Sequence, residues 1–79
     1  MTVLLFHTLR EYAGTGSFVL ATDGPMTPAQ LWEALEARHP GISRFAASTR
    51  IARNQDYLAG SERLHPGDEV ALIPPVSGG

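Results

Sequence analysis

Two apolar runs near the two ends of the sequence predict the centre of a β-sheet. The first is VLLF at residues 3–6, inside a strand predicted over residues 2–7, and the second is VALI at residues 70–73, inside a strand predicted over residues 69–73. Unbroken apolar runs are typical of strands that are covered on both faces. We therefore expect these two strands to lie side by side in the middle of the sheet.

Between these runs, residues 27–38 carry the pattern of one main helix. Thr27 can accept a hydrogen bond from a free backbone N–H, Pro28 suits the first helical position, and Gln30 completes a capping box. Leu31 and Leu35 then recur at helical spacing, and Trp32 flanks this apolar stripe. The HPG sequence at residues 39–41 is expected to end the helix.

The remaining segments predict shorter elements. Residues 17–22 and 50–54 read as strands, and residues 57–59 as a short strand after a tight turn at residues 55–56. One helical turn is expected within residues 8–14, a loop with a short turn over residues 42–48, and a turn at residues 65–68. The order predicts an α+β fold, the β-grasp or ubiquitin-like roll, with a mixed sheet of four to five strands and one main helix across one face. We expect a β-grasp domain over residues 1–75 and a flexible C-terminal tail over residues 76–79.

Composition narrows the possible functions. The chain has 79 residues, of which 43% are apolar and 18% charged, which suits one small globular domain. A formal net charge of −2 argues against nucleic acid as a partner, and no stretch has the length or hydropathy of a membrane span. We expect a cytoplasmic protein that binds neither. The sequence contains no cysteine, so any sulfur that it carries for transfer must be attached elsewhere. It also contains no lysine, so the α-amine of Met1 is the only amine available for acylation.

No constellation of side chains predicts a catalytic or metal site. The three histidines are scattered without ligand spacing, and the GTG sequence at residues 14–16 suits a turn better than a phosphate loop. Glu33 and Glu36 fit a solvated helix face, and the acidic pair at residues 68–69 fits a strand start. Residues 74–79, PPVSGG, remain as the candidate for chemistry. Prolines stiffen the exit from the sheet, and a terminal diglycine has no Cβ to block access to its carboxylate. A frayed chain end is the structural alternative.

Three segments carry a resemblance to a known family. They are residues 3–6 followed by LRE at residues 9–11, ARNQ at residues 52–55, and GDEVA at residues 67–71 running into PPVSGG at the end. The last of these is the most specific. Together they resemble the small subunit of molybdopterin synthase, a family of ubiquitin-like sulfur carriers, over nearly the whole chain.

The resemblance implies that Gly78 and Gly79 are the working part. In the implied cycle, a ubiquitin-activating-like adenylyltransferase, which holds ATP and Mg²⁺, adenylates the Gly79 carboxylate. Sulfur from a cysteine desulfurase or rhodanese route then converts the acyl-adenylate to a thiocarboxylate. The tail enters the large subunit of the synthase and donates its sulfur to cyclic pyranopterin monophosphate. The chain is thus expected to be a co-substrate and a subunit of a sulfurtransferase, without a permanently bound cofactor, in a heterotetramer of two small and two large subunits.

The resemblance also implies a partner-binding surface on the sheet beside the tail. Phe6 and Ile73 could equally be core residues, and Tyr57 stands where an aliphatic residue is expected. Arg10 is a natural partner for a carboxylate on the other protein. The positions expected to bind partners are Phe6, Arg10, Tyr57, Ile73, Pro74, Pro75, Val76 and Ser77.

Three alternatives remain open. A carrier for thiamine thiazole synthesis would share the diglycine on a β-grasp, although such carriers tend to lack the Pro-Pro exit. A ubiquitin-like modifier would be joined through Gly79 to lysines of other proteins. A binding module with an accidental diglycine would be unaffected by a residue appended after Gly79.

Overall fold

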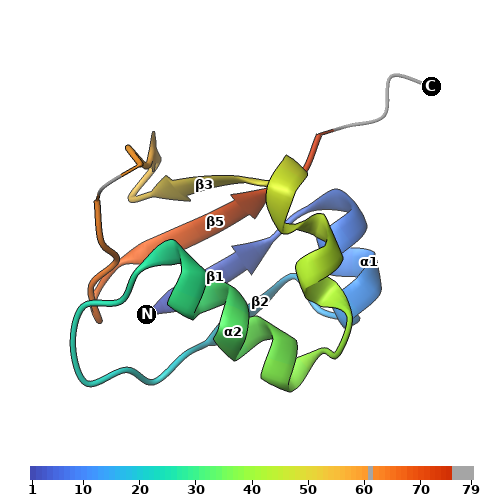
Figure 1. Cartoon of the computed structure of the whole chain (residues 1–79), viewed down its shortest axis with the longest axis horizontal. Helices are drawn as coiled ribbons and strands as arrows, with labels where there is room; N and C mark the ends of the chain where they lie inside the picture. Colours follow the sequence, from blue (N-terminus) through green and yellow to red (C-terminus); the bar gives the residue numbers. More distant parts are fainter. Residues whose placement is uncertain (61, 76–79) are drawn as a thin grey trace.

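A computed structural model describes residues 1–60 and 62–75, and these form a five-stranded mixed sheet (Figure 1). The strands are β1 (Thr2–Leu5), β2 (Ser17–Val19), β3 (Arg50–Arg53), β4 (Asp56–Tyr57) and β5 (Glu69–Ile73), in the order β2-β1-β5-β3-β4. β1 and β5 are parallel neighbours at the centre, and the other pairs are antiparallel. The predicted central pairing of the two apolar runs is confirmed.

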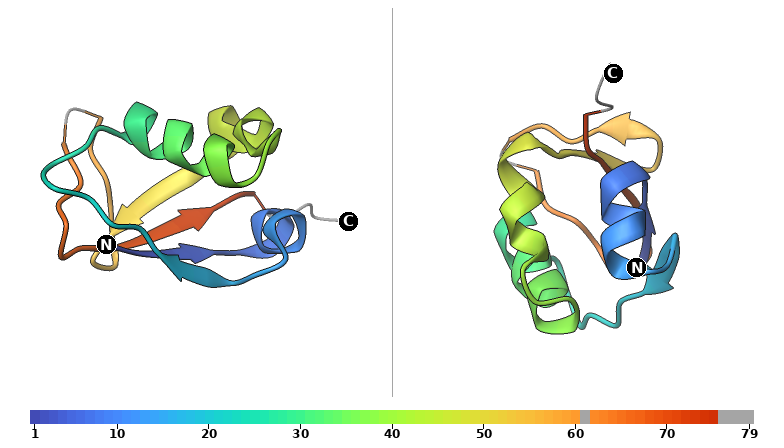
Figure 2. Two further views of the ribbon diagram at one scale, coloured as in Figure 1. Left: turned by 90° about the horizontal axis from the view of Figure 1, so that it is seen from below. Right: turned by 90° about the vertical axis from the view of Figure 1, so that its right-hand side faces the viewer.

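The helices cover one face and one end of this sheet (Figure 2). They are α1 (His7–Ala13), α2 (Pro28–Arg38) and the 3₁₀ helix η1 (Ile42–Ser48). α2 and η1 lie across one face, and α1 lies at the end of the sheet toward which β1 and β5 run. This arrangement is the predicted α+β, β-grasp fold with one main helix across the sheet.

The start of α2 follows the sequence signal. The Thr27 hydroxyl accepts from the backbone N–H of Gln30 at 3.2 Å, and the Thr27 N–H donates to the Gln30 side chain at 2.8 Å. Pro28, which lacks the N–H that a first turn leaves unpaired, occupies the first helical position. The capping box is therefore confirmed, and the helix ends at Arg38 as expected.

The core fills the space between the sheet and α2. It consists of side chains from the inner face of β1 and β5, from α1, α2 and η1, and from the connecting segments. Trp32, which the sequence placed beside the apolar stripe, is buried in this core instead. The buried apolar residues that cluster here are Met1, Val3, Leu5, Leu9, Leu20, Leu31, Trp32, Leu35, Ile42, Leu64, Val70 and Leu72.

Three boundaries differ from the sequence prediction near the N-terminus. β1 ends at Leu5, two residues early, because His7 adopts a left-handed φ of 51° and turns the chain into α1. α1 has seven residues, or about two turns, where one turn was expected, and Gly14 ends it at φ 76°. β2 ends at Val19 and does not reach residue 22.

Residues 42–48, expected to be a loop, form the helix η1. The Glu36 carboxylate holds its start by accepting from the Ser43 hydroxyl at 2.6 Å, the Gly41 N–H at 2.5 Å and the Ser43 N–H at 3.1 Å. The Ser43 hydroxyl, followed by these two backbone donors, lowers the pKa of Glu36 below its ordinary value. The signal was missed because the capping carboxylate belongs to the preceding helix.

The turn between β3 and β4 is also shifted by one residue. Asn54 and Gln55 occupy it with φ values of 51° and 75°, and Asp56 belongs to β4. Positive φ at both central residues is what a tight hairpin turn of this hand requires, and asparagine tolerates it better than most residues. The expected turn at residues 55–56 is therefore wrong by one position.

Candidate functional site

The centre of the outer face of the sheet, on the side away from α2, is apolar. Side chains alternate along each strand, so the register places Leu4, Ala71, Ala52 and Tyr57 in one row across β1, β5, β3 and β4. Ile73 continues this surface beyond Ala71 on β5. The same strands therefore carry apolar side chains on both faces.

The prediction that β1 and β5 are covered on both faces is wrong. Figure 2 shows α2 and η1 on one side of the sheet only, and no helix in the described part of the chain lies over the other. Leu4, Ala71 and Ile73 are half-buried, and their inward neighbours Leu5 and Leu72 are buried. An apolar run shows that both faces avoid water, but it does not show whether the covering element belongs to the same chain.

A shallow hollow of about 290 Å³ opens on this outer face. Apolar side chains make up most of its wall, and two polar side chains lie at one margin. Two aromatic residues in this wall, Tyr57 and Phe6, are exposed, at 59% and 39%. Large apolar groups left open to water in a continuous patch indicate a surface that another molecule covers. The lining residues are Leu4, Phe6, Ala52, Gln55, Tyr57, Glu69, Ala71 and Ile73.

Three of the residues expected to bind partners meet in this hollow. Phe6 follows β1, Tyr57 ends β4 and Ile73 ends β5, and all three line it. Arg10 is exposed on α1 and lies outside the lining, with its side chain near Gly16. Pro74 follows β5 directly and is buried. Pro74 is therefore the first residue after the strand whose end lines the hollow.

The end of the chain continues from the same place. Pro75 is exposed, next to the buried Pro74. The expected positions Val76, Ser77, Gly78 and Gly79 lie outside the described residues. The described part of the chain thus leaves the sheet beside the outer hollow, because Ile73 both ends β5 and lines the hollow.

Other lining residues were missing from the sequence prediction. Leu4, Ala52 and Ala71 form the floor of the hollow, and Gln55 and Glu69 its polar margin. Leu4 and Ala71 could have been predicted, because each lies two residues before an expected partner-binding residue, Phe6 or Ile73. Side chains two residues apart on a strand point to the same face. Ala52 needed the register between β3 and β5, which no local pattern contains.

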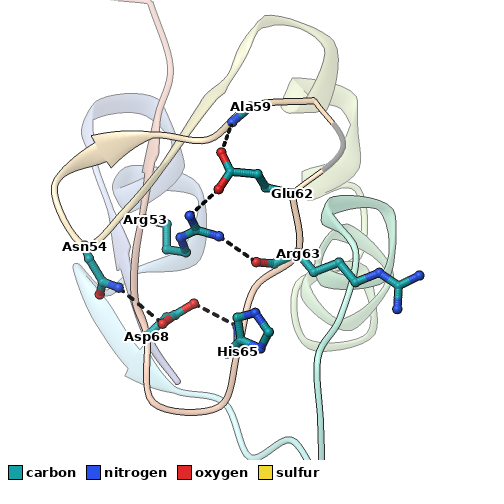
Figure 3. A network of polar contacts seen from close by, with 7 residues as sticks. All are labelled: Arg53, Asn54, Ala59, Glu62, Arg63, His65 and Asp68. Atoms are coloured by element: carbon teal, nitrogen blue, oxygen red, sulfur yellow. Dashed lines mark hydrogen bonds and ion pairs between the residues drawn. The ribbon is translucent and has the colours of Figure 1, made fainter.

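A polar network holds the loop before β5 to β3 (Figure 3). The Arg53 guanidinium forms an ion pair with Glu62 and donates to the Arg63 carbonyl at 2.9 Å. Glu62 also accepts from the Ala59 N–H at 2.9 Å. This backbone donor first, and the Arg53 guanidinium second, lower the pKa of Glu62. This part of the network supports the attachment of that loop to β3, and none of its residues lines the hollow.

The same network continues to the start of β5. Asn54 donates to the Asp68 carboxylate at 3.2 Å and accepts from the Glu69 N–H at 3.0 Å, and Asp68 also accepts from the His65 N–H at 2.8 Å. Partial burial raises the pKa of Asp68, but the His65 N–H and the Asn54 amide outweigh it, so the pKa is lowered overall. These bonds fix the left-handed turn at Asn54 next to the polar margin of the hollow.

Residues 1–60 and 62–75 contain neither a cluster of metal-binding side chains nor a helix suited to a membrane. No group of three or more histidine, acidic or cysteine side chains is placed to hold a metal ion there. No helix in this range is long and apolar enough to cross a bilayer. The hollow itself offers apolar contact, with Gln55 and Glu69 at its polar margin.

The sequence matches the model of the ThiS family over residues 3–79. A human relative, named molybdopterin synthase sulfur carrier subunit, is 36% identical over 80 residues that cover 98% of this chain and 91% of that protein. The match includes the C-terminal segment, which the structure does not describe.

Two solved structures have the same fold. The crystal structure of SAMP1 from Haloferax volcanii superposes with a TM-score of 0.83 at 36% identity, covering 100% of this chain and 98% of that one. A complex of subunits 1 and 2 of the molybdopterin-converting factor from Helicobacter pylori contains a chain with a TM-score of 0.63 at 22% identity, covering 99% and 96%. At that lower identity, the second likeness shows the fold alone.

Proposed function

Because this chain belongs to the ThiS family, we propose that it is the sulfur-carrier small subunit of a molybdopterin synthase. The large subunit of that enzyme is the partner, and it covers the outer hollow while the C-terminal segment reaches its active site. The human relative carries the corresponding name over almost the same length. The Helicobacter pylori complex pairs a chain of this fold with a second subunit.

The observation that carries the proposal is the junction between the hollow and the end of β5. Ile73 lines the hollow and Pro74 follows it, so a protein seated on Phe6, Tyr57 and Ile73 is already beside the start of the C-terminal segment. Four extended residues after Pro75 span at most about 14 Å. A partner can therefore bind the domain and receive the diglycine on one surface.

The chemistry we propose needs no catalytic group on this chain. The Gly79 carboxylate attacks the α-phosphorus of ATP on an adenylyltransferase, pyrophosphate leaves, and the acyl carbon gains AMP as a leaving group. Sulfide supplied by a cysteine desulfurase or rhodanese route then attacks this carbon, and AMP departs. If the donor attacks as a persulfide, an acyl disulfide forms first, and a second thiol of the donor must attack the donor's own sulfur, releasing the thiocarboxylate and leaving a disulfide on the donor. The resulting thiocarboxylate is ionised and soft near neutral pH, so it can donate sulfur to the pterin without a neighbouring base on the carrier.

Mass spectrometry of the C-terminus tests this directly. Full-length protein incubated with its adenylyltransferase, ATP, Mg²⁺ and a sulfur donor should gain about 16 Da, the difference between sulfur and oxygen. A variant with one alanine appended after Gly79 should fold normally, gain no mass and support no pterin sulfuration. Absence of the mass gain with an adenylyltransferase that is active on another carrier would contradict the proposal.

A protein modifier is the second candidate, because SAMP1, which is named small archaeal modifier protein 1, is 36% identical to this chain. The same activated Gly79 would then be attacked by a lysine amine of another protein. Extracts expressing a tagged chain would show adducts of higher mass that persist under reducing conditions and disappear when Gly79 is deleted. A carrier that serves only the synthase would give thiocarboxylate without such adducts.

A further inference from the structure

An exposed cation and an exposed aromatic ring stack on the outer face of the sheet. The Arg50 guanidinium carbon lies 4.2 Å from the centre of the Tyr57 ring. Arg50 pairs with Ile73 in the β3–β5 register, and Tyr57 pairs with Ala52 in the β3–β4 register. Both side chains therefore belong to the apolar face described above, and Arg50 stands at the end from which the chain leaves the sheet.

Arg50 differs from the other stacked arginines in the described part of the chain. Arg38 lies over Phe18 and donates to the Val19 carbonyl at 3.3 Å, and Arg44 lies over Tyr12 and donates to the carbonyl of residue 41 at 3.0 Å. Within residues 1–60 and 62–75, Arg50 has a ring against one face of its guanidinium and neither a carboxylate nor a carbonyl at its edge. Arg50 is exposed.

A partner that covers Tyr57 would take this guanidinium out of water as well. Desolvation of an arginine is unfavourable unless its donors find acceptors, and a carboxylate matches the planar fork of the guanidinium with two parallel hydrogen bonds. The stacked ring holds the fork in one orientation before binding, which lessens the entropy lost when the pair forms.

The charges along the face also have a direction. Glu69 begins β5 and lines the hollow, whereas Arg50 lies across from Ile73, at the other end of the same strand. Four strand residues separate the two levels, or about 13 Å. A complementary surface is therefore acidic where the chain leaves the sheet and neutral or basic at the opposite margin.

We propose that Arg50, stacked on Tyr57, is a specificity-determining contact of the docking surface and takes an aspartate or glutamate side chain of the large subunit. The inference rests on the proposed function and adds the chemistry of the partner: one carboxylate directed at Arg50, beside an apolar group that packs on Tyr57. Because Arg50 lies level with Ile73, outside the lining of the hollow on the side where the chain leaves the sheet, it also fixes the orientation in which the partner binds.

The test compares two charge reversals of equal size, Arg50→Glu and Arg63→Glu. Arg63 is exposed, and Figure 3 shows its guanidinium extending away from the network, so it is the matched control. Calorimetry with the cognate large subunit measures affinity at two salt concentrations. Arg50→Glu should weaken binding by about tenfold or more, and Arg63→Glu by less than about twofold. The affinity of the unaltered chain should fall with salt more steeply than that of Arg50→Glu.

The results separate the inference from the proposed function. Equal affinity of the two variants would overturn the inference while leaving the proposed function intact. Failure of the unaltered chain to bind the large subunit would overturn the proposed function, and the inference with it. If Arg50→Glu unfolds, Arg50→Gln replaces it, with a loss of at least about fivefold expected. A lysine in place of one acidic residue of the large subunit should restore binding of Arg50→Glu and no other variant.

Discussion

The two faces of the central sheet are built from the same strands but meet different surroundings. On the inner face, Val3 and Leu5 are 0% and 2% exposed, packed under α2. On the outer face, Phe6 and Tyr57 are 39% and 59% exposed around an apolar hollow. The centres of both faces are apolar, so the hydrophobicity of the strands does not distinguish them. The difference is that the chain covers one face with its own helix, and we assign the other to a partner.

The largest expected effect comes from neighbouring leucines on β1. Leu5→Ala removes a buried side chain from the core, and we expect the free energy of unfolding to fall by about 2–5 kcal/mol. Leu4→Ala makes the same chemical change on the half-buried outer face and should lose about 1 kcal/mol or less. Denaturant unfolding of both variants measures this. Equal losses would mean that the outer face is part of the core.

A substitution confined to the outer face should weaken partner binding while leaving stability nearly unchanged. Tyr57→Ala removes an exposed ring, so the free energy of unfolding should change by about 1 kcal/mol at most, including the lost stacking with Arg50. Affinity for the large subunit should fall by about 2 kcal/mol, because an aromatic anchor in a hollow contributes strongly to an interface. Calorimetry and thermal unfolding of one preparation measure both quantities. A variant that loses stability and keeps affinity would contradict the division between faces.

The helix that covers the inner face offers a smaller test. Thr27→Ala removes the hydroxyl that caps α2, and we expect a loss of about 1 kcal/mol in stability. Thr27→Ser keeps the acceptor and should stay within a few tenths of a kcal/mol of the unaltered chain. Neither substitution touches the outer hollow, so both variants should bind the large subunit normally. A binding defect in Thr27→Ala alone would show that the two faces are coupled.

The smallest expected effect is on the dependence of stability on pH. The pKa values of Glu36, Glu62 and Asp68 are lowered in the folded chain, so these groups stabilise it above their unfolded pKa values of about 4. That contribution is lost as the pH falls through the lower folded values. Stability should therefore decline on acidification below about pH 4.5.

One substitution isolates part of this dependence. Glu36→Gln should flatten the decline, because it removes a carboxylate that accepts from residues 41 and 43. Glu33→Gln, at an exposed position on the same helix, is the matched control and should leave the profile unchanged. Thermal unfolding between pH 3 and pH 7 distinguishes them. Identical profiles for both variants would show that the carboxylate at residue 36 does not stabilise the start of η1.

Local signals predicted much of the fold because they are complete within a few residues. The capping box that begins α2 needs only Thr27, Pro28 and Gln30, and β5 was bounded at Glu69 and Ile73 by an acidic turn and a pair of prolines. Where a partner group lies elsewhere in the chain, prediction was incomplete. η1 depends on a carboxylate from α2, and its sequence alone suggested a loop.

The residues of the candidate site likewise divide into those that the sequence predicted and those that only the strand register reveals. Phe6, Tyr57 and Ile73 were expected from the resemblance and do meet in one hollow, whereas Ala52 joins them only through strand register. The apolar pattern alone could not show that the outer face is open, because a continuous apolar run has the same pattern whether a helix or another protein covers it. The stacking of Arg50 on Tyr57 joins two strands and likewise has no local signature.

The central position of β5 has a mechanical consequence. β5 is hydrogen-bonded to β1 on one side and to β3 on the other, over nearly its whole length. A pull along the strand from Pro75 would load both ladders in shear, so many bonds would have to break together. An edge strand such as β4 would instead peel open one pair at a time. A partner that draws the chain end into a channel would therefore drag the domain as a rigid body, and the force would not unravel the fold.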